Sequence, residues 1–150
     1  RTATERDIRP CAAILADNLM WERYERTLAD AERFVAREIA MGNHLWVYEE
    51  EGEVLGFTGC IERGMMGEFP YVRVLAVAPE HRGRGIGTRL LARMEESMFR
   101  ETNLLFMMVS DFNADAFRLY NRLGYEPVGV IRDYKKKGIN EQLLVKRKPQ

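Results

Sequence analysis

The segment spanning residues 75–88 combines residue types that can bind phosphate. An apolar run leads into a turn containing Pro79, and Gly83, Gly85 and Gly87 then precede a helix-forming stretch. The first amides of a helix have no partner inside it, and the helix dipole favours negative charge there. Because glycine has no Cβ, a phosphate can approach the backbone closely. The segment therefore predicts a phosphate-binding loop at a helix N-terminus.

The spacing of the glycines separates this loop from two other kinds of phosphate loop. A P-loop ends in Gly-Lys-Ser/Thr, whereas residues 85–88 read Gly-Ile-Gly-Thr and lack the lysine. A dinucleotide fingerprint has a wider gap before its third glycine, and here every second residue is glycine. The pattern that fits is Arg/Gln-x-x-Gly-x-Gly/Ala, met by Arg82, Gly85 and Gly87. A nucleotide-binding enzyme of P-loop type is therefore disfavoured, and a turn that only starts a helix is the simpler alternative.

A second motif spans residues 113–125, with Asn113 at its start, Tyr120 two turns later and Gly124 near its end. The spacing is typical of a helix that Asn113 caps and Gly124 terminates. Asn113, Ala116 and Tyr120 recur at helical spacing, so they share one face of that helix. The motif therefore predicts an amide and a phenol that point in the same direction. The alternative is that Asn113 only caps the helix and Tyr120 only packs.

Together, the loop and the helix motif resemble the GNAT N-acetyltransferase superfamily, and the similarity extends from Ile8 to Val145. The resemblance implies acetyl-CoA as cosubstrate. Its diphosphate is expected on the loop amides, and its pantetheine in a gap between the strand before the loop and the strand after the loop's helix. The cofactor-binding residues implied in this way are Leu75, Ala76, Val77, Arg82, Gly83, Arg84, Gly85, Ile86, Gly87, Thr88, Asn113 and Tyr120.

The resemblance also implies a chemical role for Tyr120, whose hydroxyl is expected near the CoA sulfur. A tyrosine can protonate the departing thiolate, and a backbone N–H near Leu75 can stabilise the tetrahedral oxyanion. The predicted reaction is direct transfer of the acetyl group to a primary amine in a ternary complex. A non-catalytic acyl-CoA-binding sensor module on the same fold is the alternative from another class.

The base that deprotonates the amine has no clear counterpart in this sequence. Family members that acetylate protein N-termini often carry Glu on the strand before the second motif, where this chain has Met108. Other members use a Glu early on the strand before the glycine loop, and this chain has Tyr71 at that position. Glu62 and Glu68 are nearby in sequence and are the catalytic candidates. The alternatives are that both are solvent-facing carboxylates and that a chain of water molecules replaces a single base.

Trp21 and Tyr24 lie between the first two expected helices, where the family has its acceptor site, and Glu22 and Glu25 are interleaved with them. Aromatic rings and carboxylates suit a cationic amine, although a hydrophobic lid with solvated acids accounts for them equally well. Tyr134 resembles a peptide-contacting tyrosine of protein N-terminal acetyltransferases. Because the glutamate of that group is absent, we expect a small-molecule amine or amino acid as acceptor, with a peptide N-terminal amine as the alternative.

To position these motifs, helices and strands must follow one another in a particular order within one domain that covers residues 1–150. Apolar periodicity and turn residues predict the order β-α-α-β-β-β-α-β-α-β-β, an α/β fold whose mixed, mostly antiparallel sheet has about six or seven strands and helices on both faces. The first helix is expected to be capped by Asp7 and the second by Asp30. The predicted strands cover residues 2–4, 44–49, 54–61, 69–78, 104–109, 126–133 and 139–146, and the predicted helices, counting caps, residues 7–20, 30–41, 86–98 and 113–123.

The composition of the chain argues against nucleic acid, membranes and metals as partners. The chain has 23 basic and 23 acidic residues, so no net field draws it to nucleic acid or a membrane. It contains neither a long apolar run nor the apolar segment of a signal peptide. Cys11 and Cys60 are too few for a disulfide framework and are expected to be buried, reduced thiols. His44 and His81 lack clustered ligand partners, so we expect no metal site. We therefore expect a cytoplasmic protein whose oligomeric state, a homodimer included, is left open by the sequence.

Overall fold

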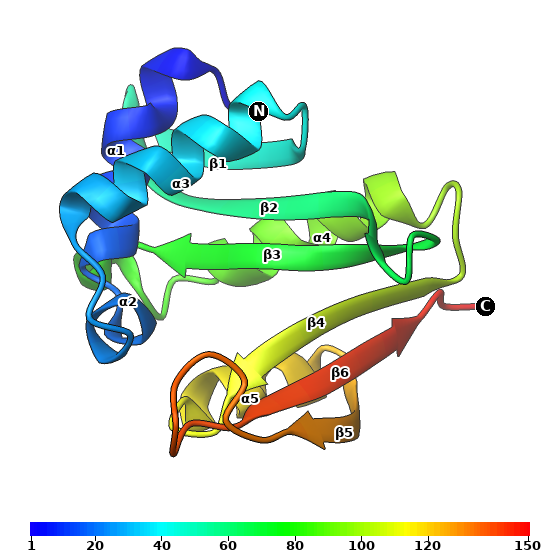
Figure 1. The fold of residues 1–150 in the computed structure, drawn as a ribbon. Helices are drawn as coiled ribbons and strands as arrows, with labels where there is room; N and C mark the ends of the chain where they lie inside the picture. The colour runs from blue at the N-terminus through cyan, green and yellow to red at the C-terminus, as the bar shows by residue number, and fades with distance from the viewer.

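The computed structural model describes residues 1–150. Six strands form in it, some from alternating and some from continuous apolar runs of the sequence. The sheet order is β1-β2-β3-β4-β6-β5, and only β3 and β4 are parallel (Figure 1). The mixed, mostly antiparallel sheet predicted from the sequence is therefore confirmed. The strands are β1 (His44–Glu50), β2 (Glu53–Met65), β3 (Phe69–Val77), β4 (Leu104–Ser110), β5 (Glu126–Ile131) and β6 (Glu141–Arg147).

Five α-helices accompany the sheet. They are α1 (Ile8–Ala16), α2 (Leu19–Arg23), α3 (Leu28–Ala40), α4 (Ile86–Met98) and α5 (Ala114–Arg122), and short 3-10 turns cover Glu5–Asp7 and Pro79–His81. None of the helices combines the length and the apolar character that crossing a membrane requires.

Two apolar cores lie on opposite faces of the sheet. On one face α1 and α3 pack against the first three strands, and Val35 and Phe57 are fully buried there. On the other face α4 packs against the sheet, and its Met94 is fully buried there. Figure 1 shows α4 and α5 behind the sheet. Helices on both faces are therefore confirmed. Cys11 and Cys60 are buried unpaired thiols, as predicted, and burial raises the pKa of each to about 12.

Strand β3 contains an extra residue, Arg73, that divides it into two parts. Val72 pairs with Cys60 and Val74 with Gly59 of β2, so Arg73 has no counterpart on that strand. Such a bulge bends the strand and interrupts the alternation of its side chains. Val72 accordingly packs in the core beneath α4, whereas Val74 packs in the core beneath α1 and α3.

The parallel pairing of β3 with β4 is short. It consists of Tyr71 with Phe106 and of Val72 with Met107. Beyond these pairs the two strands diverge toward their carboxyl ends, as Figure 1 shows. The edge of β3 that faces β4 therefore has no strand partner from Arg73 onward.

Two predictions near the N-terminus are wrong. Residues 2–4 form no strand, only an isolated bridge to Trp46. The first helix ends at Ala16 instead of near residue 20, and the separate helix α2 follows. The reason is a second N-cap, because the Asn18 side chain accepts a hydrogen bond from the Met20 N–H at 2.9 Å. A local cap therefore divides a stretch whose apolar periodicity is continuous.

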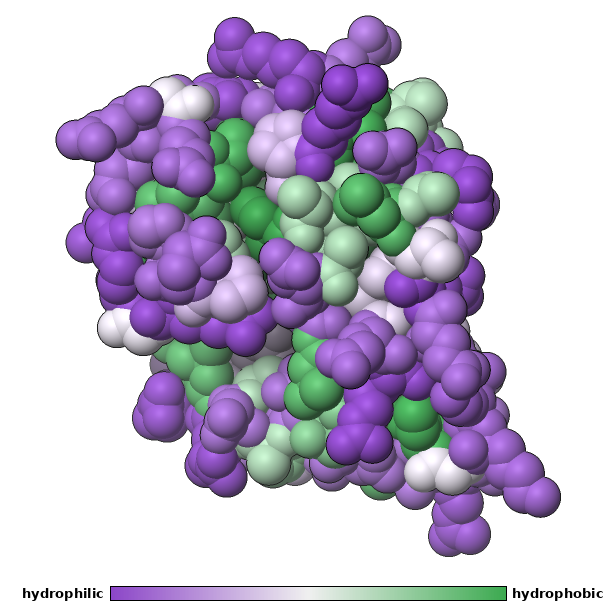
Figure 2. Space-filling model, turned by 90° about the vertical axis from the view of Figure 1, so that its left-hand side faces the viewer, coloured by the Kyte–Doolittle hydropathy of each residue, from purple (hydrophilic) through white to green (hydrophobic).

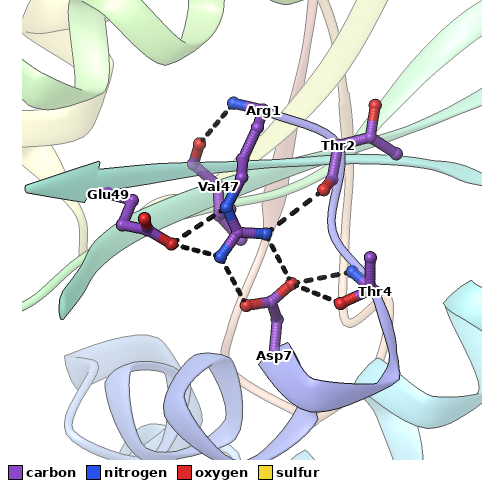
Figure 3. Close-up of polar contacts among 6 residues, drawn as sticks. All are labelled: Arg1, Thr2, Thr4, Asp7, Val47 and Glu49. Atoms are coloured by element: carbon purple, nitrogen blue, oxygen red, sulfur yellow. Dashed lines mark hydrogen bonds and ion pairs between the residues drawn. The ribbon is translucent and has the colours of Figure 1, made fainter. Parts of the chain in front are cut away.

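Neither of the two aspartates predicted to cap a helix caps it with its own side chain. Helix α3 has Thr27 as its N-cap, and Asp30 accepts the Thr27 N–H at 2.8 Å in a capping box. Asp7 occupies the N-cap position of α1, as predicted, but its side chain accepts no hydrogen bond from that helix. It accepts the Thr4 N–H at 2.7 Å and two hydrogen bonds from Arg1 at 2.9 Å each (Figure 3). Both carboxylates therefore order the residues that enter a helix.

Replacing Asp7 by Asn should lower the free energy of unfolding by about 1–3 kcal/mol, because a buried carboxylate loses its charge-assisted hydrogen bonds to the partly exposed Arg1. The hydrogen bonds from Arg1 lower the pKa of Asp7 from 3.8 to about 2. A lowered carboxyl pKa stabilises the fold above about pH 4, and this stabilisation disappears as the pH falls through 2. Urea unfolding at a series of pH values measures both effects. The matched control is Asp115→Asn, which replaces an exposed carboxylate and should leave the stability nearly unchanged. Equal stability of Asp7→Asn and wild type at pH 6 would contradict the prediction.

Candidate active site

A cleft opens where β3 and β4 separate. It is lined by residues of β3 and β4, of the α1–α2 junction and of the α5 motif, namely Val72, Arg73, Val74, Leu75, Met107, Met108, Val109, Ser110, Asn18, Met20, Asn113 and Tyr120. Figure 2 faces the side of the molecule on which the two strands diverge, and it shows apolar surface between bands of hydrophilic residues. The cleft thus brings the end of β3 together with the second sequence motif.

The glycine loop connects the carboxyl end of β3 to α4. The N–H groups of residues 83–88 make no hydrogen bond within the protein. Gly83 and Gly85 each have a φ of +78°, a conformation that favours glycine, and Gly85 is the N-cap of α4. The first turn of α4 contains no acidic residue. The loop therefore presents free donors at the positive end of a helix dipole, as phosphate binding requires.

The two arginines of the loop differ in their contacts. Arg84 makes hydrogen bonds of 2.9 and 3.0 Å to the Glu50 carboxylate and lies 2.8 Å from His81 Nδ1. Its charge is therefore compensated at the end of β1. Arg82 donates from Nε to the Val77 carbonyl at 3.3 Å and has no carboxylate partner. Of the two charges, that of Arg82 is the one available to an anion on the loop.

Helix α5 holds the amide and the phenol of the second motif at the cleft. The Asn113 side-chain oxygen accepts the Ala116 N–H at 3.3 Å, so the predicted cap is confirmed, and its NH₂ group stays free. The Tyr120 ring packs edge-on against Tyr125, with 6.1 Å between ring centroids, and its hydroxyl has no partner in the protein. Burial raises the pKa of Tyr120 to about 12. The phenol therefore keeps its proton at neutral pH, as a general acid must.

The two predicted base candidates lie outside the cleft. Glu62 is on β2, 62% exposed, with Oε2 3.8 Å from His44 Nε2. Glu68 is exposed in the turn between β2 and β3, at the opposite end of β3 from the glycine loop. The structure therefore brings neither carboxylate to the cleft, because the long hairpin of β2 and β3 carries both away from it.

The three predicted acceptor residues differ in their surroundings, although Lys135 Nζ lies 5.8 Å from the Tyr24 ring centroid and 5.9 Å from that of Tyr134. Trp21 donates from Nε1 to the Thr27 carbonyl at 2.9 Å, and its ring lies 5.9 Å from the Phe34 ring, so it supports the connection between α2 and α3. Tyr134 is 48% exposed in the connection between β5 and β6. Tyr24 contacts Ser110 at the carboxyl end of β4, where the cleft lies.

Tyr24 belongs to a polar cluster that no sequence pattern indicated. Its hydroxyl donates to Glu141 Oε1 and lies 3.4 Å from Ser110 Oγ, and Ser110 donates to the same carboxylate oxygen at 2.7 Å. Ser110 is 4% exposed and Glu141 is 6% exposed. They are register partners on β4 and β6, although 31 residues separate them in the sequence. Only strand pairing reveals the cluster.

A larger hollow, of about 650 Å³, lies against the N-terminal segment. Charged side chains line much of it, and none of the residues of the two sequence motifs that carry the predicted chemistry, Arg82 to Thr88 and Asn113 to Tyr125, reaches it. Figure 3 shows that Arg1 bridges two of its acids, Asp7 and Glu49. Because the lining of this hollow lacks the motif residues, we assign the candidate active site to the β3–β4 cleft.

The diverging parallel strands, the free loop amides and the α5 motif define the class of acyl-transferring α/β domains. The family model described as Acetyltransferase (GNAT) family matches residues 11–125 of this chain. The chain therefore belongs to the GNAT acetyltransferase family.

Particular relatives are similar over much of the chain. It is 33% identical over 100 residues to the N-alpha-acetyltransferase RimI of Mycobacterium tuberculosis, covering 65% of this chain and 62% of that one. It is 34% identical over 110 residues to an uncharacterized N-acetyltransferase of Methanocaldococcus jannaschii, covering 71% and 68%. An uncharacterized Mycobacterium leprae protein is 30% identical over 116 residues, which are 76% of this chain but 32% of that protein. The match thus spans less than two thirds of the M. tuberculosis and M. leprae relatives.

A solved structure supports the assignment of this chain to the GNAT family. The ribosomal-protein-alanine N-acetyltransferase of Brucella melitensis superposes with a TM-score of 0.78 at 26% identity, and the match covers 99% of this chain and 98% of that one. The two chains therefore share one fold over almost their whole lengths.

Proposed function

We propose that this protein transfers the acetyl group of acetyl-CoA to a primary amine by direct attack in a ternary complex. The observation that carries the proposal is the row of free N–H groups over residues 83–88, which lies at the end of β3 beside the cleft that contains Tyr120. These amides suit a diphosphate, and the unpaired edge of β3 suits an extended pantetheine arm. Solved family members of the same fold, the yncA protein of Salmonella typhimurium among them, contain acetyl-CoA.

In the proposed reaction, different residues bind the cofactor, stabilise the oxyanion and protonate the leaving group. Residues 83–88 and Arg82 hold the diphosphate, and Leu75, Ala76 and Val77 offer backbone groups to pantetheine. A backbone N–H near Leu75 stabilises the oxyanion as the amine nitrogen bonds to the acetyl carbon. The carbon–sulfur bond then breaks, and Tyr120 donates its proton to the departing thiolate.

The acceptor enters from the side of α2, where the cleft is lined by Asn18 and Met20. A small-molecule amine or an amino acid is the acceptor we favour, because Met108 occupies the position of the glutamate that protein N-terminal acetyltransferases often carry. A peptide N-terminal amine is the second candidate. It is favoured by the names of the M. tuberculosis and B. melitensis relatives, an N-alpha-acetyltransferase and a ribosomal-protein-alanine N-acetyltransferase.

Release of free thiol from acetyl-CoA tests the proposal. The purified protein is incubated with acetyl-CoA and, separately, with amines, amino acids, polyamines and short peptides with free N-termini. We expect amine-dependent thiol release with at least one class, and the class identifies the acceptor. Binding of acetyl-CoA with no thiol release in any arm would instead indicate a non-catalytic acyl-CoA-binding module.

A further inference from the structure

The cluster of Tyr24, Ser110 and Glu141 has the position and the bonding of a proton acceptor. Glu141 is 6% exposed and has no ion-pair partner within 4.0 Å. Both hydrogen bonds that it accepts go to Oε1, and its second oxygen, Oε2, accepts none from a side chain. Burying a carboxylate without an ion-pair partner is costly, and such groups often belong to functional sites.

Ser110 connects this carboxylate to the cleft. Its Oγ donates to Glu141 Oε1 at 2.7 Å, and the same residue lines the cleft together with Asn113 and Tyr120. Alternate residues of β4, Met107 and Val109 among them, pack in the core beneath α4, so Ser110 points to the opposite face of the sheet, toward Tyr24. Tyr120 packs against the α4-side core. The two groups therefore reach the cleft from opposite faces.

We propose that Ser110 and Glu141 form the proton-accepting pair for the acceptor amine, with Tyr24 as the positioning residue of Glu141. This inference rests on the proposed acetyl transfer. The ammonium form of the acceptor gives one proton to Ser110 Oγ, while Ser110 passes its own hydroxyl proton to Glu141 Oε1. The neutral amine then attacks the acetyl carbon, the carbon–sulfur bond breaks, and Tyr120 protonates the departing thiolate on the other side. The new amide nitrogen releases its extra proton to water, water returns a proton to the Tyr120 phenolate, and Glu141 gives the first proton to solvent. Base and acid are thus separated by the thioester, and every proton is accounted for.

Tyr24 holds the carboxylate in this position. Its hydroxyl donates to Glu141 Oε1, and burial together with this bond raises the pKa of Tyr24 to about 12, so the phenol remains a donor. Its ring packs edge-on against Phe112, with 6.4 Å between centroids. The charged or titratable groups nearest to this cluster on the surrounding elements are Tyr71 and Arg73 on β3, Asp111 after β4, and Lys135 before β6.

The test compares the pH dependence of kcat for wild type and Glu141→Gln with one accepted amine. Gln keeps an oxygen for Tyr24 and Ser110 but cannot take a proton, and the amine's own ionisation is common to all proteins compared. We expect kcat at pH 7 to fall about 10- to 100-fold and the acidic limb of the profile to keep only the part that the amine's own ionisation causes. The dissociation constant of acetyl-CoA, measured by calorimetry, should stay within about twofold because phosphate and pantetheine contacts are untouched.

Further variants separate proton acceptance from a purely structural role. Ser110→Ala leaves the bond between Tyr24 and Glu141 in place and should lower kcat with unchanged acetyl-CoA affinity, which covers the case in which Glu141→Gln does not fold. Glu126→Gln, an exposed carboxylate on β5, is the matched control and should behave as wild type. Glu62→Gln and Glu68→Gln test the two carboxylates suggested by the sequence and should keep the acidic limb.

Several results would overturn the inference. An intact acidic limb in Glu141→Gln, with or without a lower rate, would exclude Glu141 as the proton acceptor, and loss of the limb in Glu62→Gln or Glu68→Gln would assign that role elsewhere. The failure of the proposed function is a different observation, because wild-type protein would then release no thiol with any amine.

Discussion

Replacement of Tyr120 by Phe should lower kcat by about 10- to 1000-fold while acetyl-CoA affinity changes little. The hydroxyl that is removed has no hydrogen-bond partner within the protein, so the fold loses no bond. What the variant loses is the proton donor for the thiolate. Because burial raises the pKa of Tyr120 to about 12, that donor is present throughout neutral and mildly alkaline pH in the wild type. Steady-state thiol release together with calorimetry measures both quantities.

The neighbouring Tyr125 provides the contrasting control for this prediction. Its hydroxyl donates to Glu95 at 2.8 Å, and its side chain is 1% exposed, so Tyr125→Phe removes a structural bond. That variant should be less stable to urea, by about 1 kcal/mol, and should keep most of its kcat. A Tyr120→Phe protein with the kcat of wild type would remove Tyr120 from the mechanism.

Replacement of Gly85 by Asn should weaken acetyl-CoA binding about 10- to 100-fold, the loss of one charge-assisted hydrogen bond or more. Gly85 has a φ of +78°, and a Cβ added there meets no atom within 4 Å. Asn is among the residues that tolerate this conformation, so the loop keeps its shape. The new side chain then occupies the space above the free amides and keeps the diphosphate away from them. Calorimetric titration with CoA gives the dissociation constant.

Gly42 is the matched control for the loop substitution. It follows α3, has a φ of +72° and likewise meets nothing within 4 Å of an added Cβ. Gly42→Asn should therefore carry the same backbone cost and leave CoA binding unchanged. Equal CoA affinity in Gly85→Asn and Gly42→Asn would show that the amides of residues 83–88 do not hold the diphosphate.

Elements built from contiguous residues were predictable from the sequence. Asn113 caps α5 and Gly124 follows its end with a φ of +92°, as the spacing predicted. Helix α4 begins at Ile86, directly after its N-cap Gly85, also as predicted. The first helix was predicted too long because two local signals compete at Asn18, whose side chain starts a new helix within an apolar repeat. Side-chain caps depend on geometry that periodicity does not contain.

The sequence by itself determined the glycine loop and the α5 motif, on which the family resemblance rests, because each motif consists of residues within a few turns of one another. Only the tertiary structure decided which carboxylate lies near the cleft. Glu141 meets Ser110 through the register of β4 and β6, and the bulge at Arg73 together with the short pairing of β3 and β4 opens the cleft. Register and divergence are properties of paired strands, and residues distant along the chain set them together.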